Sequence, residues 1–371
     1  MKAIIDVREW QTTVDMETGY PCAADFQDHA ALSAIAARHP YPGDRGNQGV
    51  RWVFEVTREI TALREPDLLC LTFPQLVIAG KHRPLPEGEK AAILGEITNG
   101  IADLAVKMGL KTVIVGGGAL TPLRGYIKPA AVNGFFQGTA WSSIYAGVYK
   151  ADEGDFERVR AMEDISFLVK KEDILPRCCN DSFVAQLPDI LIGAKKGFAF
   201  KALGSANNPL YAVEQENEFL PVYSEIGTPT HIEGVRNMMD KALDCGKKVL
   251  LAVIEGADCE DFESKAVPNR RDWFTYSGSW LYYTLATGKP FYSFSLPPVF
   301  NMARDSGFPV RYPFSLSALK PCDDSIGCRP DKYSVCVGGR SLTSHTMFNC
   351  DINAECFVRS MINMGTMITV R

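Results

Sequence analysis

The chain has 371 residues, of which 46% are hydrophobic and 22% are charged, and its formal net charge is −5. This apolar content is sufficient for a sizeable folded core, which excludes a largely disordered protein. Lysine and arginine residues are scattered singly or in pairs and form no basic stripe, so we expect no nucleic-acid partner.

The N-terminal sequence MKAIIDVREW predicts a short strand over Lys2–Val7. Its apolar run is short and charged side chains follow at once, so no signal peptide is expected. Apolar stretches elsewhere, such as 248–254, are far shorter than the roughly 20 residues that span a bilayer. The eleven cysteines lie mostly inside apolar runs, a pattern typical of reduced, buried thiols. We therefore expect a soluble cytoplasmic protein with no membrane partner.

Three helices and a strand are predicted in the first third of the chain from their apolar periodicity. The helices are expected over His29–Arg38, Val50–Arg64 and Glu87–Met108, and the strand over Asp67–Phe73. This strand is continuously apolar rather than alternating, which is typical of parallel sheets that are covered on both faces.

One junction recurs along the chain: a helical pattern runs into a glycine, and an apolar run follows. Glycine accepts the left-handed conformation that ends a helix, so each junction predicts a helix followed by a strand. The four segments are LAVKMGLKTVIV (104–115), MMDKALDCGKKVLLAVI (238–254), WLYYTLATGKPFYSFSL (280–296) and SMINMGTMITV (360–370). The last helix is expected over Asp351–Met364, with Asp351 as its N-cap and Glu355 in its first turn.

The stretch from 125 to 225 contains short β-type pieces, such as ISFLVK and ILIGAKKGFAF, and one clear helical segment at Gly154–Arg160. We interpret it as an inserted or cap subdomain, although an antiparallel extension of the main sheet gives the same pattern. The predicted domains are an α/β core formed by 1–124 and 226–371 and a smaller β-rich subdomain at 125–225. The expected fold class is α/β, with a layered, mostly parallel sheet and helices on both faces.

A glycine-rich turn, Gly116-Gly117-Gly118, follows the predicted strand 111–115. Ligands of open α/β sheets bind beyond the carboxyl ends of the strands, and glycine lets backbone N–H groups approach an anion closely. The dinucleotide-binding fingerprint is not met, because Thr121 stands at its third glycine position. We predict an anion-binding turn, and a tight turn that needs glycine for steric reasons is the alternative.

A second glycine-rich segment, GGRSLTSH (338–345), follows the predicted strand 333–337. Arginine supplies a fork of donors and glycine exposes backbone amides, so this segment predicts an oxyanion or phosphate site. The candidate catalytic residues are Arg340, Ser341 and His345, and the candidate anion-binding residues are Gly338, Gly339 and Ser344. A polar loop with Arg340 in a surface ion pair is the alternative.

The acidic sequence EGADCED (255–261) follows the predicted strand 248–254. Carboxylates at a strand end can hold a hard divalent cation, so Glu255 and Asp258 are candidate ligands of a metal cofactor. No histidine lies nearby in the sequence, and a solvated acidic loop is the alternative.

The C-terminal cysteines form a denser group that invites a zinc or iron–sulfur interpretation. They are Cys322, Cys328, Cys336, Cys350 and Cys356. None forms a C-x2-C pair and their spacing is irregular, so structural packing is favoured.

Several segments together resemble the alkaline phosphatase superfamily, especially its nucleotide pyrophosphatase and type I phosphodiesterase branch. They are REPDLLCLT (64–72), the helix Glu87–Met108, KTVIVGGGALTPL (111–123), and DISFLVKKEDILPR with LPDILIGAKKGFAF within 164–200. The resemblance covers about a third of the chain and implies an α/β fold. Where the family places a metal-binding Asp-His-Gly, this chain has Gly116-Gly117-Gly118, so the resemblance is not extended to a two-zinc site. The segment 248–255 is similar to the family's opening strand, in a permuted order.

Three functions agree with these features. The first is a hydrolase or transferase that acts on a small phosphorylated or otherwise anionic substrate, with or without a divalent metal. The second is a non-catalytic α/β binding module that keeps a hydrolase-like fold without its metal ligands. The third, a thiol enzyme, depends on Cys178-Cys179 and Cys259 and ranks last, because the chain has no C-x-x-C motif.

Overall fold

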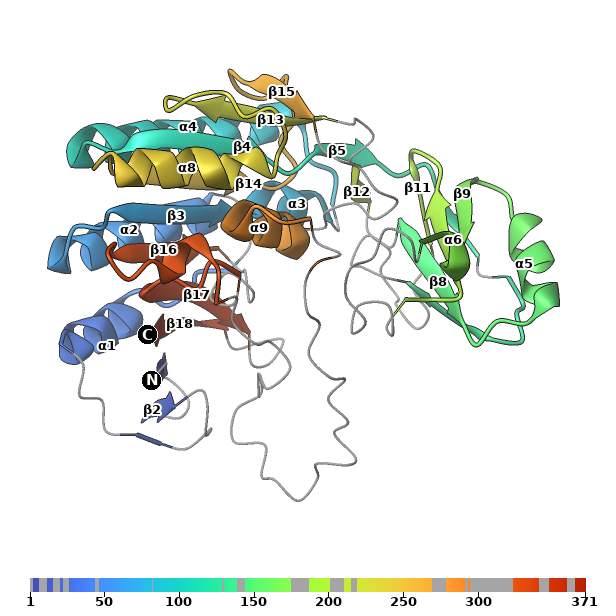
Figure 1. The fold of residues 1–371 in the computed structure, drawn as a ribbon, viewed down its shortest axis with the longest axis horizontal. Helices are drawn as coiled ribbons and strands as arrows, with labels where there is room; N and C mark the ends of the chain where they lie inside the picture. The colour runs from blue at the N-terminus through green and yellow to red at the C-terminus, as the bar shows by residue number, and fades with distance from the viewer. Residues whose placement is uncertain are drawn as a thin grey trace.

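A ten-stranded sheet forms the centre of the protein (Figure 1). The computed structural model describes residues 3–6, 12–15, 21–22, 27–43, 47–81, 83–128, 130–138, 144–174, 187–200, 210–214, 219–268, 278–290, 293, 323–339, 347–358 and 364–371. The strands of this sheet, in spatial order, are β15 (Lys265–Pro268), β13 (Phe219–Ser224), β4 (Lys111–Gly116), β14 (Val249–Ile254), β3 (Leu68–Phe73), β16 (Ser334–Gly338), β17 (Ile352–Val358), β18 (Met364–Val370), β1 (Ala3–Asp6) and β2 (Thr12–Asp15).

The sheet is mixed, whereas the sequence predicted a mostly parallel one. Its five central strands, β4, β14, β3, β16 and β17, are parallel to their neighbours within this group. The pairs toward both edges are antiparallel: β15 with β13, β13 with β4, β17 with β18, β18 with β1, and β1 with β2. The continuously apolar strands therefore belong to the centre, where every residue of β3 and β14 is buried.

The helices expected near the N-terminus are confirmed, and most of the predicted helix-ending glycines are as well. The helices associated with the large sheet are α1 (His29–Arg38), α2 (Gln48–Leu63), α3 (Gln75–Lys81), α4 (Glu87–Met108), α8 (Gly234–Asp244) and α9 (Gly278–Thr287). Gly109, Gly246 and Gly288 follow α4, α8 and α9 with φ of 62°, 73° and 70°. These are left-handed values that favour glycine, as the junction pattern predicts.

Alternate residues of the central strands enter two separate cores. Leu69 and Leu71 of β3 pack with residues of α1, α2 and α4. Leu68 and Cys70 of the same strand pack with residues of α8 and α9. Side chains of a strand alternate between its faces, so each core lies against one face of the sheet.

The predicted C-terminal helix over Asp351–Met364 is wrong. Ile352–Val358 forms β17, which pairs with β16 on one side and with β18 on the other. Ile352, Ala354 and Cys356 are buried in one core at a spacing of two residues, which is the period of a strand. Sheet pairing on both sides outweighs the local N-cap signal of Asp351.

Residues between 119 and 214 form smaller sheets beside the large one (Figure 1). An antiparallel four-stranded sheet contains β7 (Phe135–Gly138), β8 (Tyr145–Tyr149), β10 (Ile190–Ala194) and β9 (Ile165–Lys170), and α5 (Glu153–Arg160) and α6 (Lys171–Ile174) belong to the same region. Two strand pairs join β5 (Ala119–Pro122) to β12 (Tyr211–Glu214) and β6 (Gly125–Ile127) to β11 (Phe198–Phe200). Within the sequence ILIGAKKGFAF, β10 and β11 do not pair with each other, because β10 pairs with β8 and β9 and β11 pairs with β6.

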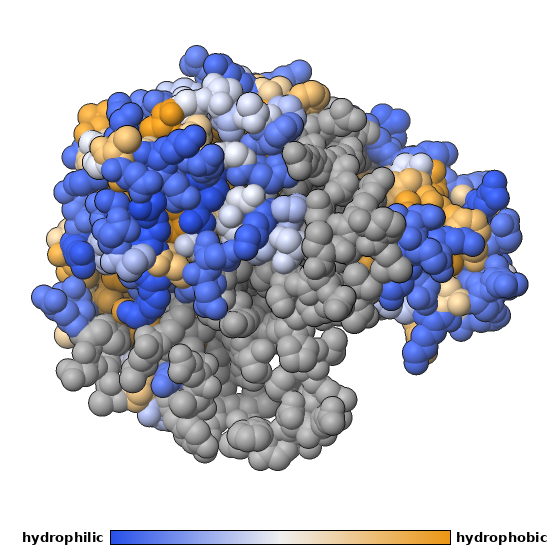
Figure 2. All heavy atoms as spheres, in the orientation of Figure 1, coloured by the Kyte–Doolittle hydropathy of each residue, from blue (hydrophilic) through white to orange (hydrophobic). Residues whose placement is uncertain are grey.

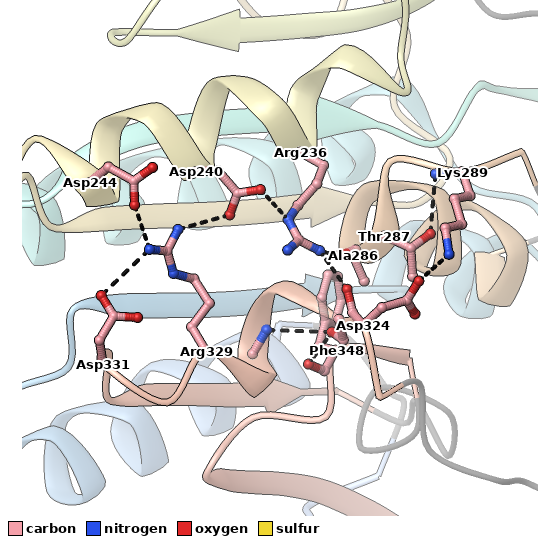
Figure 3. Close-up of polar contacts among 12 residues, drawn as sticks. Arg236, Asp240, Asp244, Ala286, Thr287, Lys289, Asp324, Arg329, Asp331 and Phe348 are labelled. Carbon is pink, nitrogen blue, oxygen red and sulfur yellow. Dashed lines mark hydrogen bonds and ion pairs between the residues drawn. The ribbon is translucent and has the colours of Figure 1, made fainter.

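A network of arginine and aspartate residues ties α9 and residues 323–331 to α8 (Figure 3). Arg236 donates from Nε to Asp240 Oδ2 at 2.7 Å and from Nη1 to the carbonyl oxygens of Ala286 and Asp324. Arg329 donates to the other oxygen of Asp240 at 3.1 Å. Because Ala286 lies in the last turn of α9, Arg236 fixes the end of this helix against α8.

The described surface is largely hydrophilic on the face shown in Figure 2, with small apolar areas on the body and on the region of the four-stranded sheet. The large apolar side chains that are exposed are Leu63, Val106, Phe135, Leu210 and Phe219. Within the described part of the chain, no helix combines the length and the apolar character needed to cross a bilayer.

Candidate functional site

The carboxyl ends of β4, β14, β3 and β16 lie side by side at one edge of the sheet. Ile254 at the end of β14 is level with Gly116 on one side and with Phe73 on the other. Gly338 at the end of β16 is level with Thr72 of β3. This edge, which we call the carboxyl edge, therefore brings together Gly116–Gly118, Glu255 and Gly338–Gly339, three of the segments selected from the sequence.

The two glycine segments are too far apart for one phosphate to contact both. β14 and β3 lie between β4 and β16, which separates the two strand ends by three interstrand spacings, or about 14 Å. A single small anion can therefore contact one glycine segment or the other.

Steric packing accounts for Gly116–Gly118. A Cβ on Gly116 would lie 2.5 Å from the carbonyl oxygen of Ala257, and one on Gly117 would lie 3.1 Å from the Cα of Glu255. The backbone N–H groups of Gly117 and Gly118 donate to the carbonyl oxygens of Ile254 and Ala257, at 2.8 and 3.2 Å. These N–H groups are thus already hydrogen-bonded to backbone oxygens. Close packing and these hydrogen bonds account for the glycines without a bound anion.

Glu255 is the titratable group of the carboxyl edge. It follows β14 directly, and its backbone N–H donates to the carbonyl oxygen of Phe73 at 3.0 Å. Its Oε1 accepts a hydrogen bond from the hydroxyl of Tyr282 on α9. Burial raises the pKa of Glu255, and the hydrogen bond from Tyr282 lowers it by less. The residue nevertheless keeps part of its surface exposed.

Tyr282 forms the other half of this pair. Burial raises the pKa of its hydroxyl well above the usual value, and the negative charge of Glu255 raises it further. Tyr282 therefore stays a neutral hydrogen-bond donor, while Glu255 exchanges its proton at a higher pH than an exposed glutamate does.

The predicted metal site gains no support. Asp258 Oδ1 accepts from the backbone N–H of Cys259 at 2.7 Å, and Asp261 pairs with Lys90 at 2.6 Å. Within the described residues, no group of three or more His, Cys, Asp or Glu side chains could hold a metal ion. The roles of Glu255 and Asp258 as ligands of a divalent cation therefore stay predictions, and no step below depends on a metal.

Four candidate residues of the segment 338–345 lie outside the described residues, so their predicted roles stay predictions. They are Arg340, Ser341, Ser344 and His345. Gly338 and Gly339 are described, and the N–H of Gly339 donates to the carbonyl oxygen of Thr72 at 3.1 Å.

The thiol-enzyme hypothesis gains no support from Cys259, the described residue among its three cysteines. Burial raises the pKa of the Cys259 thiol, the opposite of what a reactive thiolate needs. Cys178 and Cys179 lie outside the described residues. In the C-terminal group, Cys336, Cys350 and Cys356 are buried, in agreement with structural packing.

Sequence reasoning missed Tyr282 and Gln75 at this edge. Tyr282 stands within an apolar helix and carries no local signal of function. Gln75 follows a predicted strand by two residues, so the rule that selected the other candidates should have selected it as well. It is 2% exposed, and among the described residues its amide has no hydrogen-bond partner.

Comparison with models of known protein families gives no match, and a search of curated proteins gives none either. Among solved structures, the chain has a weak resemblance to phosphonoacetate hydrolase from Sinorhizobium meliloti 1021, which was solved in complex with phosphonoformate. The identity is 13%, the TM-score is 0.39, and the match covers 52% of this chain and 54% of the other. The matched part thus spans about half the length of that hydrolase.

Proposed function

We propose that this protein is a hydrolase or transferase that acts on a small phosphorylated or otherwise anionic substrate at the carboxyl edge. The supporting observation is the pair of Glu255 and Tyr282, in which a carboxyl group of raised pKa follows a central parallel strand. Ligands of α/β sheets bind at this edge, and perturbed carboxyl groups concentrate at functional sites.

The chemistry of this pair is general acid catalysis. Because burial raises its pKa, Glu255 keeps its proton to a higher pH than an exposed glutamate does. It donates this proton to the leaving oxygen as the bond between that oxygen and phosphorus breaks. The Tyr282 hydroxyl then stabilises the remaining carboxylate through its hydrogen bond to Oε1. The attacking water or acceptor hydroxyl returns a proton to Glu255.

The test is an activity screen on phosphomonoesters, phosphodiesters and phosphonates, followed by the E255Q variant. We expect E255Q to lower kcat by about 100-fold or more, because an amide cannot donate the proton. The control is E260Q, which changes an exposed carboxylate of the same loop and should leave kcat unchanged. Equal activity of E255Q and wild type would contradict the assignment.

A non-catalytic binding module is the second candidate. It is favoured by the steric explanation of Gly116–Gly118. Saturable binding of a phosphorylated compound without turnover in the same screen would support it over the enzyme.

We also propose the layered organisation that the sequence predicts, with helices on both faces of the large sheet and a β-rich subdomain inserted at 125–225. Two separate cores on the central strands support the first part. A third core, which contains Val148 and Ile192, supports the second. Limited proteolysis that releases a stable fragment from this region would test the insertion.

A further inference from the structure

Gln75 is a buried side chain at the carboxyl edge whose amide is unpaired among the residues that the structure describes. It follows β3 by two residues, and its exposed fraction is 2%. Neither its Nε2 nor its Oε1 has a hydrogen-bond partner within the described part of the chain. An amide in this situation destabilises the folded protein, because it has given up its hydrogen bonds to water.

Two glycines make room for this amide. A Cβ on Gly339, directly after β16, would lie 2.1 Å from Nε2 of Gln75, and a Cβ on Gly49 in α2 would lie 3.2 Å from the same atom. A side chain at either position would therefore push against the amide. The packing holds the amide in place and supplies no hydrogen bond to it.

We propose that Gln75 is a substrate-binding residue and that its amide recognises a hydroxylated phosphate ester. This inference rests on the proposed function, because it names the substrate class of the same edge. Nε2 is a donor and Oε1 is an acceptor. An all-acceptor anion such as sulfate pairs with Nε2 and leaves Oε1 unpaired, whereas a phosphate ester that also carries a hydroxyl group pairs with both.

Gln75 and Glu255 lie at the ends of neighbouring strands, so one small substrate can reach both. Phe73, at the end of β3, accepts a hydrogen bond from the N–H of Glu255. Neighbouring strands are about 5 Å apart, which a chain of a few carbon atoms spans. In this arrangement Glu255 donates a proton to the leaving oxygen, and Gln75 forms hydrogen bonds with the hydroxylated part of the substrate.

The experiment compares esters that match in charge and length and differ in their hydroxyl groups. The probes are glycerol phosphate against propyl phosphate and ribose 5-phosphate against pentyl phosphate, with binding measured by calorimetry. For wild type we expect the hydroxylated member of a pair to bind at least about 10-fold more tightly, because its analogue leaves the buried amide unpaired.

Two variants assign this preference to the amide. Q75M removes the amide at similar volume, and G339A keeps the glutamine while forcing it to move. Both should reduce the preference to less than about threefold, whereas Q48M, at an exposed glutamine in α2, should retain it. A preference that survives in both variants would overturn the inference.

The melting temperature without ligand separates substrate binding from a structural role. Replacing an unpaired amide by an apolar group of similar shape removes a destabilising feature, so Q75M should raise Tm by about 2 °C. If a bound water pairs with the amide as part of the scaffold, Q75M should lower Tm and leave the ester preference unchanged, which would overturn the inference.

Equal binding of both members of each ester pair by wild type would overturn the inference while leaving the proposed function standing. No binding of any ester by wild type would overturn both.

Discussion

Asp155 and Glu255 are carboxylic acids in two regions of the molecule, and their pKa values are shifted in opposite directions. Asp155, in α5, accepts hydrogen bonds from the backbone N–H groups of Asn133 and Gly134, at 2.8 and 3.0 Å, and from Arg158. Burial alone would raise its pKa, but these donors hold the pKa of Asp155 well below its usual range. Glu255 is partly buried, accepts a hydrogen bond from the neutral hydroxyl of Tyr282, and has a raised pKa.

This difference separates a structural carboxylate, Asp155, from Glu255, the carboxyl group that we propose for proton transfer. Several donors fix Asp155 in its charged form, so it can neither take up nor release a proton near neutral pH. Glu255 changes its protonation state at a higher pH than an exposed glutamate does, which suits it for proton transfer. The variants below test whether each group belongs to the class assigned here.

The largest expected effect on stability is at Asp155. D155N removes the charge that pairs with Arg158 and weakens the hydrogen bonds from Asn133 and Gly134, so Tm should fall by roughly 5 °C. Because the pKa of Asp155 is lowered in the folded state, its contribution is present above about pH 4 and is lost as the pH falls through the lowered value. Thermal melts over a pH series measure the fall in Tm and its dependence on pH. E157Q, at an exposed position on α5, is the control. Melting at the wild-type temperature would show that Asp155 is not structural.

The next effect concerns Arg236, which shares Asp240 with Arg329 and binds the end of α9. R236M should lower the free energy of unfolding by roughly 2 kcal/mol, because it leaves Ala286 O and one side of Asp240 without their donor. Urea denaturation measures the change, and R160M, at an exposed position on α5, is the matched control. Since α9 carries Tyr282, a loss of stability in R236M together with a fall in kcat would also connect this network to the carboxyl edge.

A smaller and opposite effect is expected for E255Q. The raised pKa means that the stability contributed by Glu255 is complete below the pKa of the unfolded chain and is lost as the pH rises through the raised value. E255Q lacks this loss, so at pH 8 it should melt about 2 °C above wild type, and the difference should narrow toward pH 4. If wild type were the more stable protein at pH 8, Glu255 would be a structural carboxylate like Asp155.

The smallest effect is expected for Y282F. The hydrogen bond from Tyr282 lowers the pKa of Glu255, so its removal raises that pKa further and moves the alkaline limb of the pH–rate profile upward. The change in kcat at the optimum should stay below about tenfold. Y283F, on the same helix, is the control and should leave the limb in place. A downward movement in Y282F would contradict the proposed direction of proton transfer.

Local signals in the sequence predicted most helices and central strands. Gly109, Gly246 and Gly288 end their helices in the left-handed conformation, and this requirement depends on one residue and its neighbours. The helix predicted over 351–364 from the N-cap pattern of Asp351 is wrong, because Ile352–Val358 pairs as a strand with β16 and β18. Pairing depends on partners that are distant in the chain, which local patterns do not contain.

The sequence by itself determined that this protein is an α/β protein with an apolar parallel centre and that Glu255 follows a buried strand. Only the tertiary structure decided that this residue faces Tyr282, that Gly116–Gly118 are packed against 255–257, and that the buried amide of Gln75 has no hydrogen-bond partner among the described residues. The physical reason is the range of each interaction. Helix ends and apolar runs are fixed by neighbouring residues, whereas the pKa of a carboxyl group and the pairing of an amide depend on side chains brought together by folding.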